Sequence, residues 1–444
     1  MKTFYKFTIL WLAIFSEMAV TAQTELLQSG PMTGYSTMKE VVLWVQTKQS
    51  AEVYFKYWNT QTPTNKINTQ KFKTQSTDGF VAQIIADQLE PGQHYQYELY
   101  INNKKIVRPY ELKFESQPLW KWRGDAPDFS FATGSCAYIN ESQYDRPGIP
   151  YGSNYQIFNH IYEEKPQFML WLGDNLYLRE ADWNSTTGIL HRYTHTRSLP
   201  ELQPLWGSMH HYAIWDDHDF GPDNSDRSFH MKRQTEKVFK SFFPNPNYIF
   251  KEGITGYFDW ADCDFFLLDN RYWRTPDNRT DLANPSLLGS EQLEWLIDAL
   301  TYSTASFKFV VMGGQFLNPM KKGETYENCA PAEKDYIIKT IQRLQINGVI
   351  FITGDVHHTE LSKLDTYNAY PLYDLTVSPL TSGIGAKDAD KNPLQVGGTL
   401  VVEHNFAKME VFGTSKDRTL RITIINALGE KKWTKEIKAA DLKF

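Results

Sequence analysis

The chain has 444 residues, a net charge of −6 and 22% charged residues, and this length suggests two or three domains. The charge balance excludes a strongly basic, nucleic-acid-binding surface. Aromatic residues make up 15%, which indicates a large core but assigns no function. Three cysteines are too few for a disulfide scaffold, and at least one thiol must stay unpaired.

The first 22 residues have the pattern of a secretory signal peptide. Lys2 and Lys6 precede an apolar run over residues 7–15, and small residues end the segment at Ala22, where we expect cleavage. The run is too short for a membrane anchor, and no other stretch is long and apolar enough to span a bilayer. We therefore expect an exported protein, either periplasmic or extracellular.

Residues 23–125 alternate β-rich runs with turn formers such as Asp78-Gly79. Short strands at this spacing predict an antiparallel β-sandwich. The run from Leu89 to Tyr97 resembles the turn and the tyrosine-bearing strand of fibronectin type III domains. Because no cluster of acids or histidines occurs here, we expect a structural or docking module, followed by a linker and a second domain over residues 126–444.

Several apolar strands of the second domain end in glycine or an acid beside side chains able to bind metal. The clearest is Phe168–Leu172, which runs into Gly173 and Asp174, with Tyr177 three residues further on. Ligand sites of open α/β sheets lie at the carboxyl ends of strands, so these endings predict one site at one sheet edge. The other endings are Gly134-Ser135-Cys136, Asp216-Asp217-His218-Asp219, Asp269-Asn270-Arg271, Gly313-Gly314-Gln315 and Gly354-Asp355-Val356-His357-His358.

The order of β-rich and helical segments in this domain predicts its fold class. Many β-rich pieces with few short βαβ links favour an α+β fold, a mixed four-layer sandwich, over a doubly wound sheet. Apolar spacing predicts helices over 152–164 and 226–243 and a further helix that begins at Ser290. We expect residues 372–426, with a strand at Leu400–Glu403 among them, to complete the second sheet of the sandwich.

The expected side chains favour a metal site. Like charges a few ångströms apart repel, so several carboxylates in one cavity could not all be ionised without cations. Carboxylates alone suit calcium or magnesium, but a thiol (Cys136) and a phenol (Tyr177) favour iron(III) in one subsite, with an oxygen-ligated divalent ion beside it. His357 adds a nitrogen donor. The carboxylates in question are Asp174, Asp216, Asp217 and Asp355.

These blocks, taken in order, resemble the PhoD-like alkaline phosphatases, relatives of the purple acid phosphatases within the calcineurin-like metallophosphoesterases. The resemblance covers nearly the whole mature chain and implies a four-layer α/β/β/α metallophosphoesterase domain after an N-terminal β-sandwich. The motifs that carry it are Gly134-Ser135-Cys136, Gly173-Asp174-Asn175-Leu176-Tyr177, Trp215-Asp216-Asp217-His218-Asp219, Leu268–Arg274 and Gly354-Asp355-Val356-His357.

The resemblance implies an iron(III) surrounded by one thiolate, one carboxylate, one phenolate and one imidazole. The carboxylate, Asp174, would also bridge to the second subsite. The implied ligands of the iron are Cys136, Asp174, Tyr177 and His357.

The resemblance also implies an oxygen-rich subsite for one or two divalent ions, with calcium as the expected ion. Asp217 would bind there and take part in catalysis, Asp355 would join it, and Asp216 is a further ligand candidate. Arg271 would bind the phosphate, and His218 would assist the leaving group or orient the substrate.

The function implied is that of a secreted, metal-dependent phosphoester hydrolase of the alkaline phosphatase D type, in which a metal-activated hydroxide attacks a small-molecule phosphoester. No covalent phosphoenzyme is expected, because Ser135 has no evident base. A phosphodiesterase or phospholipase-type hydrolase with the same metals is one alternative. A secreted binding protein with a structural metal site is the other.

Several residues keep two interpretations. The order Asp223-Asn224 departs from the family's Asn-Asp, so either side chain could serve the metal site. Gln315 stands where the wider superfamily places a histidine, and it could contact solvent or substrate. Asp219 could orient His218 or cap a turn, and Arg271 could pair with Asp269. For seven further histidines we expect structural roles: His160, His191, His195, His210, His211, His230 and His404.

Overall fold

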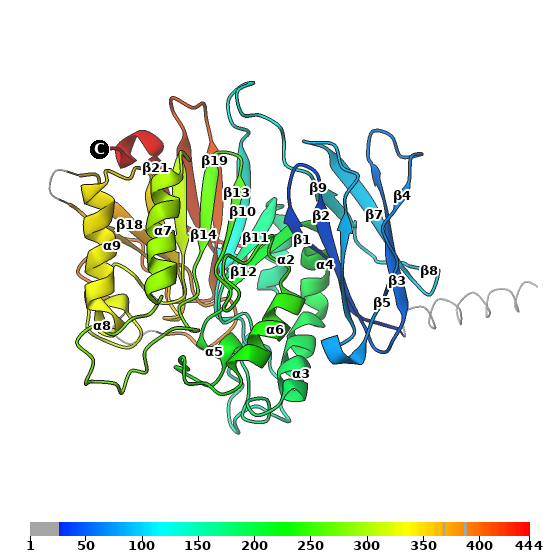
Figure 1. Cartoon of the computed structure of the whole chain (residues 1–444), viewed down its shortest axis with the longest axis horizontal. Coiled ribbons are helices and arrows are strands. Elements are labelled where there is room, and N and C mark those ends of the chain that lie inside the picture. Colours follow the sequence, from blue (N-terminus) through cyan, green and yellow to red (C-terminus); the bar gives the residue numbers. More distant parts are fainter. Residues whose placement is uncertain (1–25, 367–368, 386–388) are drawn as a thin grey trace, which may run out of the picture.

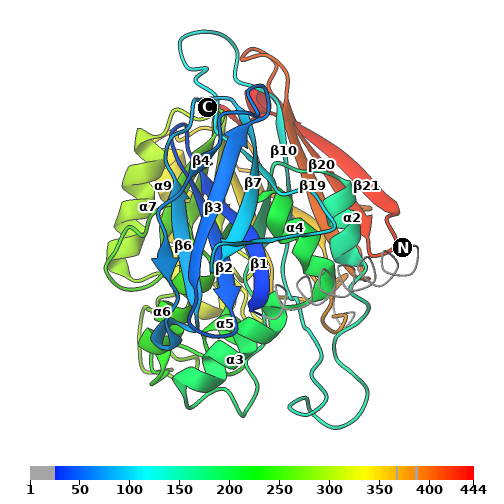
Figure 2. The ribbon, with the colours of Figure 1, turned by 90° about the vertical axis from the view of Figure 1, so that its right-hand side faces the viewer.

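The computed structural model describes residues 26–366, 369–385 and 389–444, so the predicted signal peptide lies outside the described residues. The first part of the chain forms two β-sheets (Figures 1 and 2). One sheet has the order β1-β2-β6, with strands Leu27–Ser36, Val41–Thr47 and Val81–Ala86. The other has the order β4-β3-β7-β8, in which β5 pairs with β3 and β9 pairs with β7. Its strands are β3 (Glu52–Asn59), β4 (Ile67–Asn68), β5 (Phe72–Lys73), β7 (His94–Ile101), β8 (Lys104–Ile106) and β9 (Lys113–Glu115).

The predicted β-rich N-terminal region is therefore present. Within the run that resembles a fibronectin type III segment, the hydroxyl of Tyr95 accepts a hydrogen bond of 2.8 Å from the backbone N–H of Glu90. A tyrosine tied to the backbone a few residues upstream is a recurrent corner of β-sandwiches. The likeness of the whole region to that domain type stays a prediction.

The rest of the chain is built around two six-stranded sheets. The first has the order β12-β11-β10-β19-β20-β21, and the second has the order β13-β14-β15-β16-β18-β17. The strands of the first are β10 (Phe129–Gly134), β11 (Phe168–Leu172), β12 (His210–Ile214), β19 (Asn405–Phe412), β20 (Thr419–Asn426) and β21 (Lys431–Lys438). Those of the second are β13 (Gly256–Trp260), β14 (Cys263–Leu267), β15 (Phe307–Val311), β16 (Val349–Thr353), β17 (Glu360–Leu364) and β18 (Leu372–Thr376).

The two sheets pack face to face through aromatic side chains. The ring of Phe131 on β10 lies 5.4 Å from that of Phe265 on β14 and 5.7 Å from that of Phe309 on β15, measured between centroids. Strands β10, β11 and β12 are parallel to one another, as are β14, β15, β16 and β18. Every residue of β11 and β16 is buried, as expected for apolar strands covered on both faces.

Helices flank the paired sheets (Figure 1). In Figure 1, α7 (Ser290–Tyr302) and α9 (Pro331–Arg343) lie on the side away from the N-terminal sheets, whereas α2 (Ile157–Glu163) and α4 (Gln203–Ser208) lie toward them. The mixed α/β fold with an N-terminal β-rich region is confirmed, and the full four-layer order stays a prediction. The remaining helices are α3 (Thr186–Arg197), α5 (Asp217–Phe220), α6 (Lys232–Phe242), α8 (Tyr326–Cys329) and the short η1 (Ser76–Asp78), η2 (Pro200–Leu202) and η3 (Ala439–Leu442).

The prediction that residues 372–426 complete one sheet is wrong. Strand β18 joins the second sheet, whereas β19 and β20 join the first through an antiparallel pairing of β19 with β10. Leu400–Glu403 forms no strand but one isolated bridge, between Val401 and Thr359. Short apolar runs indicate that strands exist, but their partners are set by pairing across hundreds of residues. Helices α2 and α6 also begin later than predicted, after turns.

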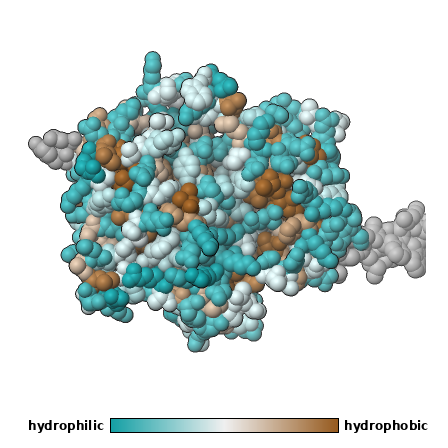
Figure 3. Space-filling view, in the orientation of Figure 1, coloured by the Kyte–Doolittle hydropathy of each residue, from teal (hydrophilic) through white to brown (hydrophobic). Residues whose placement is uncertain are grey.

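The face of the molecule in Figure 3 is mostly hydrophilic, with small, separated hydrophobic patches. Among the described residues, no helix combines the length and apolarity needed to cross a membrane.

Candidate metal centre

The polar residues that follow β11, β12 and β16 meet around one cavity of about 370 Å³. Asp174, Asp217, His218, Asp355 and His357 line this cavity. The endings after β11, β12, β15 and β16 line this cavity, and they come from two packed sheets and not from the single sheet edge that the sequence predicted. Within each sheet, parallel strands bring their carboxyl ends to the same edge.

The backbone at the strand ends is unusual. Cys136, Asp174, Asp355 and His357 have φ angles of 62°, 50°, 70° and 60°, all in the left-handed region. Non-glycine residues adopt this region at a cost of about 1–3 kcal/mol, and such residues concentrate at functional sites. The left-handed turn directly after each strand directs these side chains toward a common point.

The first ligand group consists of Cys136, Asp174 and His357, whose donor atoms all lie within 4.8 Å of one another. The sulfur of Cys136 is 3.6 Å from Oδ2 of Asp174. The hydroxyl of Tyr177 is 3.2 Å from Nε2 of His357, so the phenol joins this group. Thiol, carboxylate, imidazole and phenol thus come together from three separate loops.

The surroundings of this group shift its titration. Burial and the nearby Asp174 raise the pKa values of Cys136 and Tyr177 well above their ordinary values. Burial and the like charge of Asp217 raise the pKa of Asp174, and burial lowers the pKa of His357 to about 4. Each of these shifts favours the neutral form of its group, as expected for titratable groups crowded in a low-dielectric site.

The second ligand group consists of Asp174, Asp217 and His218. Oδ2 of Asp217 accepts a hydrogen bond of 2.7 Å from the backbone N–H of Asn224. Burial by itself would raise the pKa of Asp217. The positive charges of His218 and Arg271 outweigh burial and leave this pKa below its ordinary value. Asp217 therefore stays an anion, and Asp174 is common to both groups, as a bridging carboxylate requires.

Arg271 lies behind the cavity and is fully buried. Its Nη1 and Nη2 atoms donate to both carboxylate oxygens of Glu324, at 2.7 and 2.5 Å, and its Nε donates to Asp216. The alternative partner, Asp269, accepts a hydrogen bond from the backbone N–H of Arg271 and none from its guanidinium. The guanidinium is not among the described groups that line the cavity, so its role as a phosphate ligand stays a prediction and would require Glu324 to move.

Glu324 was missed by the sequence reasoning. It lines the cavity, keeps only 8% of its side chain exposed, pairs with Arg271 and Arg274, and forms a third acidic group with Asp216 and Asp217. It follows no apolar strand, so the strand-end pattern could not identify it. The only signal in the sequence was the pair Arg271 and Arg274, three residues apart, because two buried arginines need an acid to match their charge.

The acids fit a cation on geometric grounds. Oδ2 of Asp216 and Oδ1 of Asp217 are buried and have no hydrogen-bond partner among the described residues. Unpartnered buried carboxylate oxygens are costly, and a metal ion would satisfy them. Together with the sulfur, phenol and imidazole donors, they make a set suited to one softer and one harder cation.

Four residues left open by the sequence can now be placed. Asp219 caps helix α5: its carboxylate accepts from the backbone N–H groups of Asp216 and Asn175, each at 3.0 Å. Asp223 and Asn224 both line the cavity. Gln315 lines it too, and its amide donates to Oε1 of Glu360 at 2.6 Å.

Two further expectations concern cysteines and serine. All three cysteines, at positions 136, 263 and 329, are free. The hydroxyl of Ser135 donates to the carbonyl of Val377 at 2.9 Å and is buried, which gives it the contacts of a structural serine.

Comparison with known proteins agrees with this geometry. A family model described as PhoD-like phosphatase matches residues 131–422, and a model described as a domain of unknown function (DUF7800) matches residues 24–119. Alkaline phosphatase D of Bacillus subtilis (strain 168) is 22% identical over 337 residues, which are 63% of this chain and 54% of that protein. The chain thus spans about half the length of this curated relative.

Solved structures share the fold. A structure titled as that of PhoD matches with a TM-score of 0.75 and 18% identity, over 93% of this chain and 89% of the other. Purple acid phosphatase PPD1 from yellow lupin (Lupinus luteus) seeds matches with a TM-score of 0.67 and 12% identity, over 92% and 74% of the two chains. Since the family model covers more than half of the sequence, this chain belongs to the PhoD-like phosphatase family.

Proposed function

We propose that this protein is a metal-dependent phosphoester hydrolase of the alkaline phosphatase D type. The observation that carries the proposal is the convergence of thiol, phenol, imidazole and carboxylate donors from separate loops on one cavity. Structural metal sites are closed, whereas catalytic sites keep a position open to substrate. Here Asp174, Asp217 and His357 border a cavity of about 370 Å³, which is large enough for a small phosphoester.

The proposed cofactors are iron(III) and calcium. Cys136, Asp174, Tyr177 and His357 would hold iron(III), while Asp217 and Asp355, with Asp216 behind them, would hold one or two calcium ions. When bound, these ions would activate water and offset charge on the phosphoryl oxygens.

The chain's own residues would position the reacting groups. The ring of His218 lies against that of Tyr177, tilted by 33° with centroids 4.1 Å apart. The His218 side chain is 21% exposed, and it lines the cavity. Its Nε2 lies 3.6 Å from Asp223 and 3.9 Å from Asp217. A histidine held between two carboxylates at the cavity wall can carry a proton to the leaving oxygen.

The test combines metal analysis with turnover. The protein purified with iron and calcium should hydrolyse p-nitrophenyl phosphate, lose this activity after chelation, and regain it when both metals return. His218→Ala should lower kcat by roughly 10²–10⁴-fold, with exposed His230→Ala as the matched control. Full activity in metal-free protein would refute the proposal.

The same assay separates the two hydrolase classes. We propose that monoesters are preferred, and hydrolysis of bis-p-nitrophenyl phosphate at a higher kcat/KM than the monoester would instead establish the phosphodiesterase. Metal binding without turnover of either compound would leave the binding protein as the function.

We also propose that the protein is exported. The charged start and short apolar run of the first 22 residues support this. Protein recovered from the periplasm or the medium should begin at Gln23, whereas a start at Met1 would contradict export by this route.

A further inference from the structure

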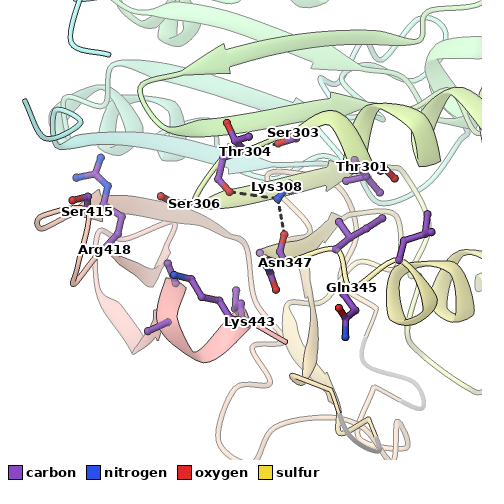
Figure 4. Close-up of a pocket in the computed structure, with 18 of the residues that line it drawn as sticks. Thr301, Ser303, Thr304, Ser306, Lys308, Gln345, Asn347, Ser415, Arg418 and Lys443 are labelled. Atoms are coloured by element: carbon purple, nitrogen blue, oxygen red, sulfur yellow. Dashed lines mark hydrogen bonds between the residues drawn. The ribbon is translucent and has the colours of Figure 1, made fainter. Parts of the chain in front are cut away.

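A second cavity lies at the opposite edge of the second sheet. It measures about 410 Å³ and is lined by residues that flank the starts of β15 and β16, by the turn before β20 and by η3. The catalytic cavity gathers residues that follow the ends of strands, so the two cavities share no residue among those that line them. Figure 4 shows Lys308, Asn347 and Ser303 around this second cavity.

The charge of this cavity is one-sided. Four cationic side chains line it, and none of the described residues in its lining is acidic. Lys416 and Lys443 are exposed at its rim. Arg418 is already matched, because it pairs with Asp128 at 2.8 Å and Asp262 at 2.9 Å.

Lys308, by contrast, is a buried cation without an acidic partner. Only 4% of the residue is exposed. Its ammonium donates to the carbonyl oxygen of Asn347 at 2.7 Å and lies 3.5 Å from that of Ala305 (Figure 4). The nearest acid that acts on it, Asp264, already accepts hydrogen bonds from Tyr257 and Ser303. No ion pair to Lys308 exists within the described part of the chain.

A buried ammonium held only by carbonyl oxygens lacks a counter-charge, and this is costly unless an anion approaches. The cavity also offers hydroxyl groups that can donate to oxyanions, from Thr304 and Ser306. Its volume lies within the range of small-molecule sites. The unmatched charge and the hydroxyl groups point to an anionic ligand whose oxygen atoms accept hydrogen bonds, rather than to an apolar one.

We propose that this cavity is an anion-binding site, distinct from the metal centre, that takes the phosphate or sulfate group of a small molecule. Lys308 forms the floor of the site and supplies the unmatched charge. Lys416 and Lys443 attract the anion at the rim, and the hydroxyl groups donate hydrogen bonds to oxygen atoms of the ligand. The alternative is that Lys308 only ties the two loops together through their carbonyl groups.

Location is tested first, with the full chain. Crystals soaked in selenate, an anomalous scatterer that mimics sulfate, should show a peak within hydrogen-bond distance of Nζ of Lys308. A peak confined to the metal centre, or absent, would overturn the proposal. Calorimetric titration with inorganic phosphate, inorganic sulfate and glucose 6-sulfate then shows whether the free anion or the ester is the better ligand.

Affinity is tested by substitution. Lys308→Met removes the charge but keeps an unbranched apolar stem, and it should weaken selenate binding by about tenfold or more, because hydrogen bonds to charged groups contribute about 1.5–3 kcal/mol. Lys431→Met, an exposed lysine on β21, is the matched control and should change nothing. Unaltered affinity in Lys308→Met would assign the lysine to loop cross-linking alone.

A second variant covers a failure of Lys308→Met to fold. The exposed pair Lys416→Gln and Lys443→Gln should weaken binding roughly threefold at low salt, and less at high salt, because rim charges act through a screened field. Binding that is equal to wild type at low salt would contradict the site. Since these measurements follow binding and not turnover, they stand or fall separately from the proposed hydrolase activity.

Discussion

The ring of Tyr177 packs in the site, and its hydroxyl is a candidate metal ligand. Its ring packs against Tyr138 and His218, with centroids 5.0 and 4.1 Å apart, and its hydroxyl reaches His357. Burial raises the pKa of the phenol, so only a strongly acidic cation could make it a phenolate at neutral pH. The state of this residue would therefore report whether the proposed iron site is formed.

Replacing Tyr177 by Phe removes the phenolic oxygen and keeps the ring. We expect the visible tyrosinate-to-iron(III) charge-transfer band of the iron-loaded protein to disappear, because the absorbing ligand is gone. An absorption spectrum with elemental analysis measures this. Tyr138→Phe, which removes a neighbouring hydroxyl bonded to Asp145, should leave the band in place. A band that survives in Tyr177→Phe would exclude Tyr177 as a ligand.

Glu324 allows a comparison of a buried and an exposed acid on the same arginine. It pairs with Arg274 at 2.7 Å and Arg271 at 2.5 Å with only 8% of its side chain exposed, whereas Asp277 pairs with Arg274 at 47% exposure. Glu324→Gln should lower the free energy of unfolding by roughly 3 kcal/mol, because Arg271 and Arg274, two buried cations, each lose one of their anionic partners. Asp277→Asn should change it by less than about 1 kcal/mol. Equal effects in thermal unfolding would contradict this assignment.

His210 makes stability depend on pH. Its Nδ1 donates to the carbonyl of Gly34 at 2.8 Å, and its Nε2 accepts from the N–H of Glu115 at 3.2 Å. Only the neutral ring satisfies both, and burial lowers the pKa of His210 to about 4 from 6.5. The unfolded chain then binds the proton more tightly than the native chain. Its contribution is present above pH 6.5 and is lost as the pH falls toward 4.

The loss expected from His210 is roughly 3 kcal/mol. Unfolding free energies measured from pH 8 to pH 4 should fall more steeply for the wild type than for His210→Gln, which does not titrate. Other buried groups contribute to both slopes equally, so the difference isolates this residue. Parallel slopes would show that His210 is not responsible.

At the scale of elements, the loops that follow β11 and β15 lie so close to Asp216 that two of their positions have no room for a side chain. A Cβ on Gly173, after β11, would lie 2.7 Å from the Cβ of Asp216, and one on Gly313, after β15, would lie 2.3 Å from its Oδ2. Glycine is needed at Gly173 because the backbone of Trp215 and Asp216 lies against it, and at Gly313 because the carboxylate of Asp216 does. The glycines thereby leave room for the carboxylate of Asp216.

Gly313→Ala should therefore displace the carboxylate of Asp216. We expect at least about tenfold weaker retention of the divalent ion, as seen when groups that orient a metal ligand are disturbed. Metal content after dialysis against a graded chelator measures this. Gly397→Ala, where a Cβ meets nothing within 4 Å, is the control. Unchanged retention in Gly313→Ala would remove Asp216 from the metal centre.

At the scale of the whole molecule, the N-terminal sheets and the catalytic part share a buried boundary (Figure 1). Trp44 of β2 is fully buried there, its ring lies 5.5 Å from that of Phe242 on α6, and its Nε1 donates to the carbonyl of Ser241 at 2.8 Å. The guanidinium of Arg197 on α3 lies 5.2 Å from the same ring. Trp44 thus couples the two parts.

Trp44→Ala should destabilise the protein by about 3–5 kcal/mol, because it leaves a large cavity at this boundary. Thermal unfolding should begin at a lower temperature and separate into two transitions. The matched control is Trp122→Ala, since Trp122 is 91% exposed and its removal leaves no cavity. A wild-type unfolding curve for Trp44→Ala would contradict the coupling.

Much of the site could be predicted from sequence because its residues follow apolar strands directly. Cys136 and Asp174 follow parallel strands of the first sheet and His357 follows a strand of the second. Parallel strands bring their carboxyl ends to one edge of a sheet, but the packing of the two sheets was needed to bring His357 to the other two residues. Glu324 could not be found in this way, since it enters the cavity from a loop. Its partners, Arg271 and Arg274, are more than 45 residues away in the sequence.

The sequence by itself determined where the apolar strands before the site lie, which polar residues end them and which family the chain belongs to, because apolar runs and motif order are local properties. Only the tertiary structure decided that β19 and β20 pair with β10, that Asp219 caps a helix and that Arg271 is held by Glu324. These outcomes depend on partners that are distant along the chain or on competition for one buried charge. Neither strand pairing nor charge pairing is encoded within a single window of residues.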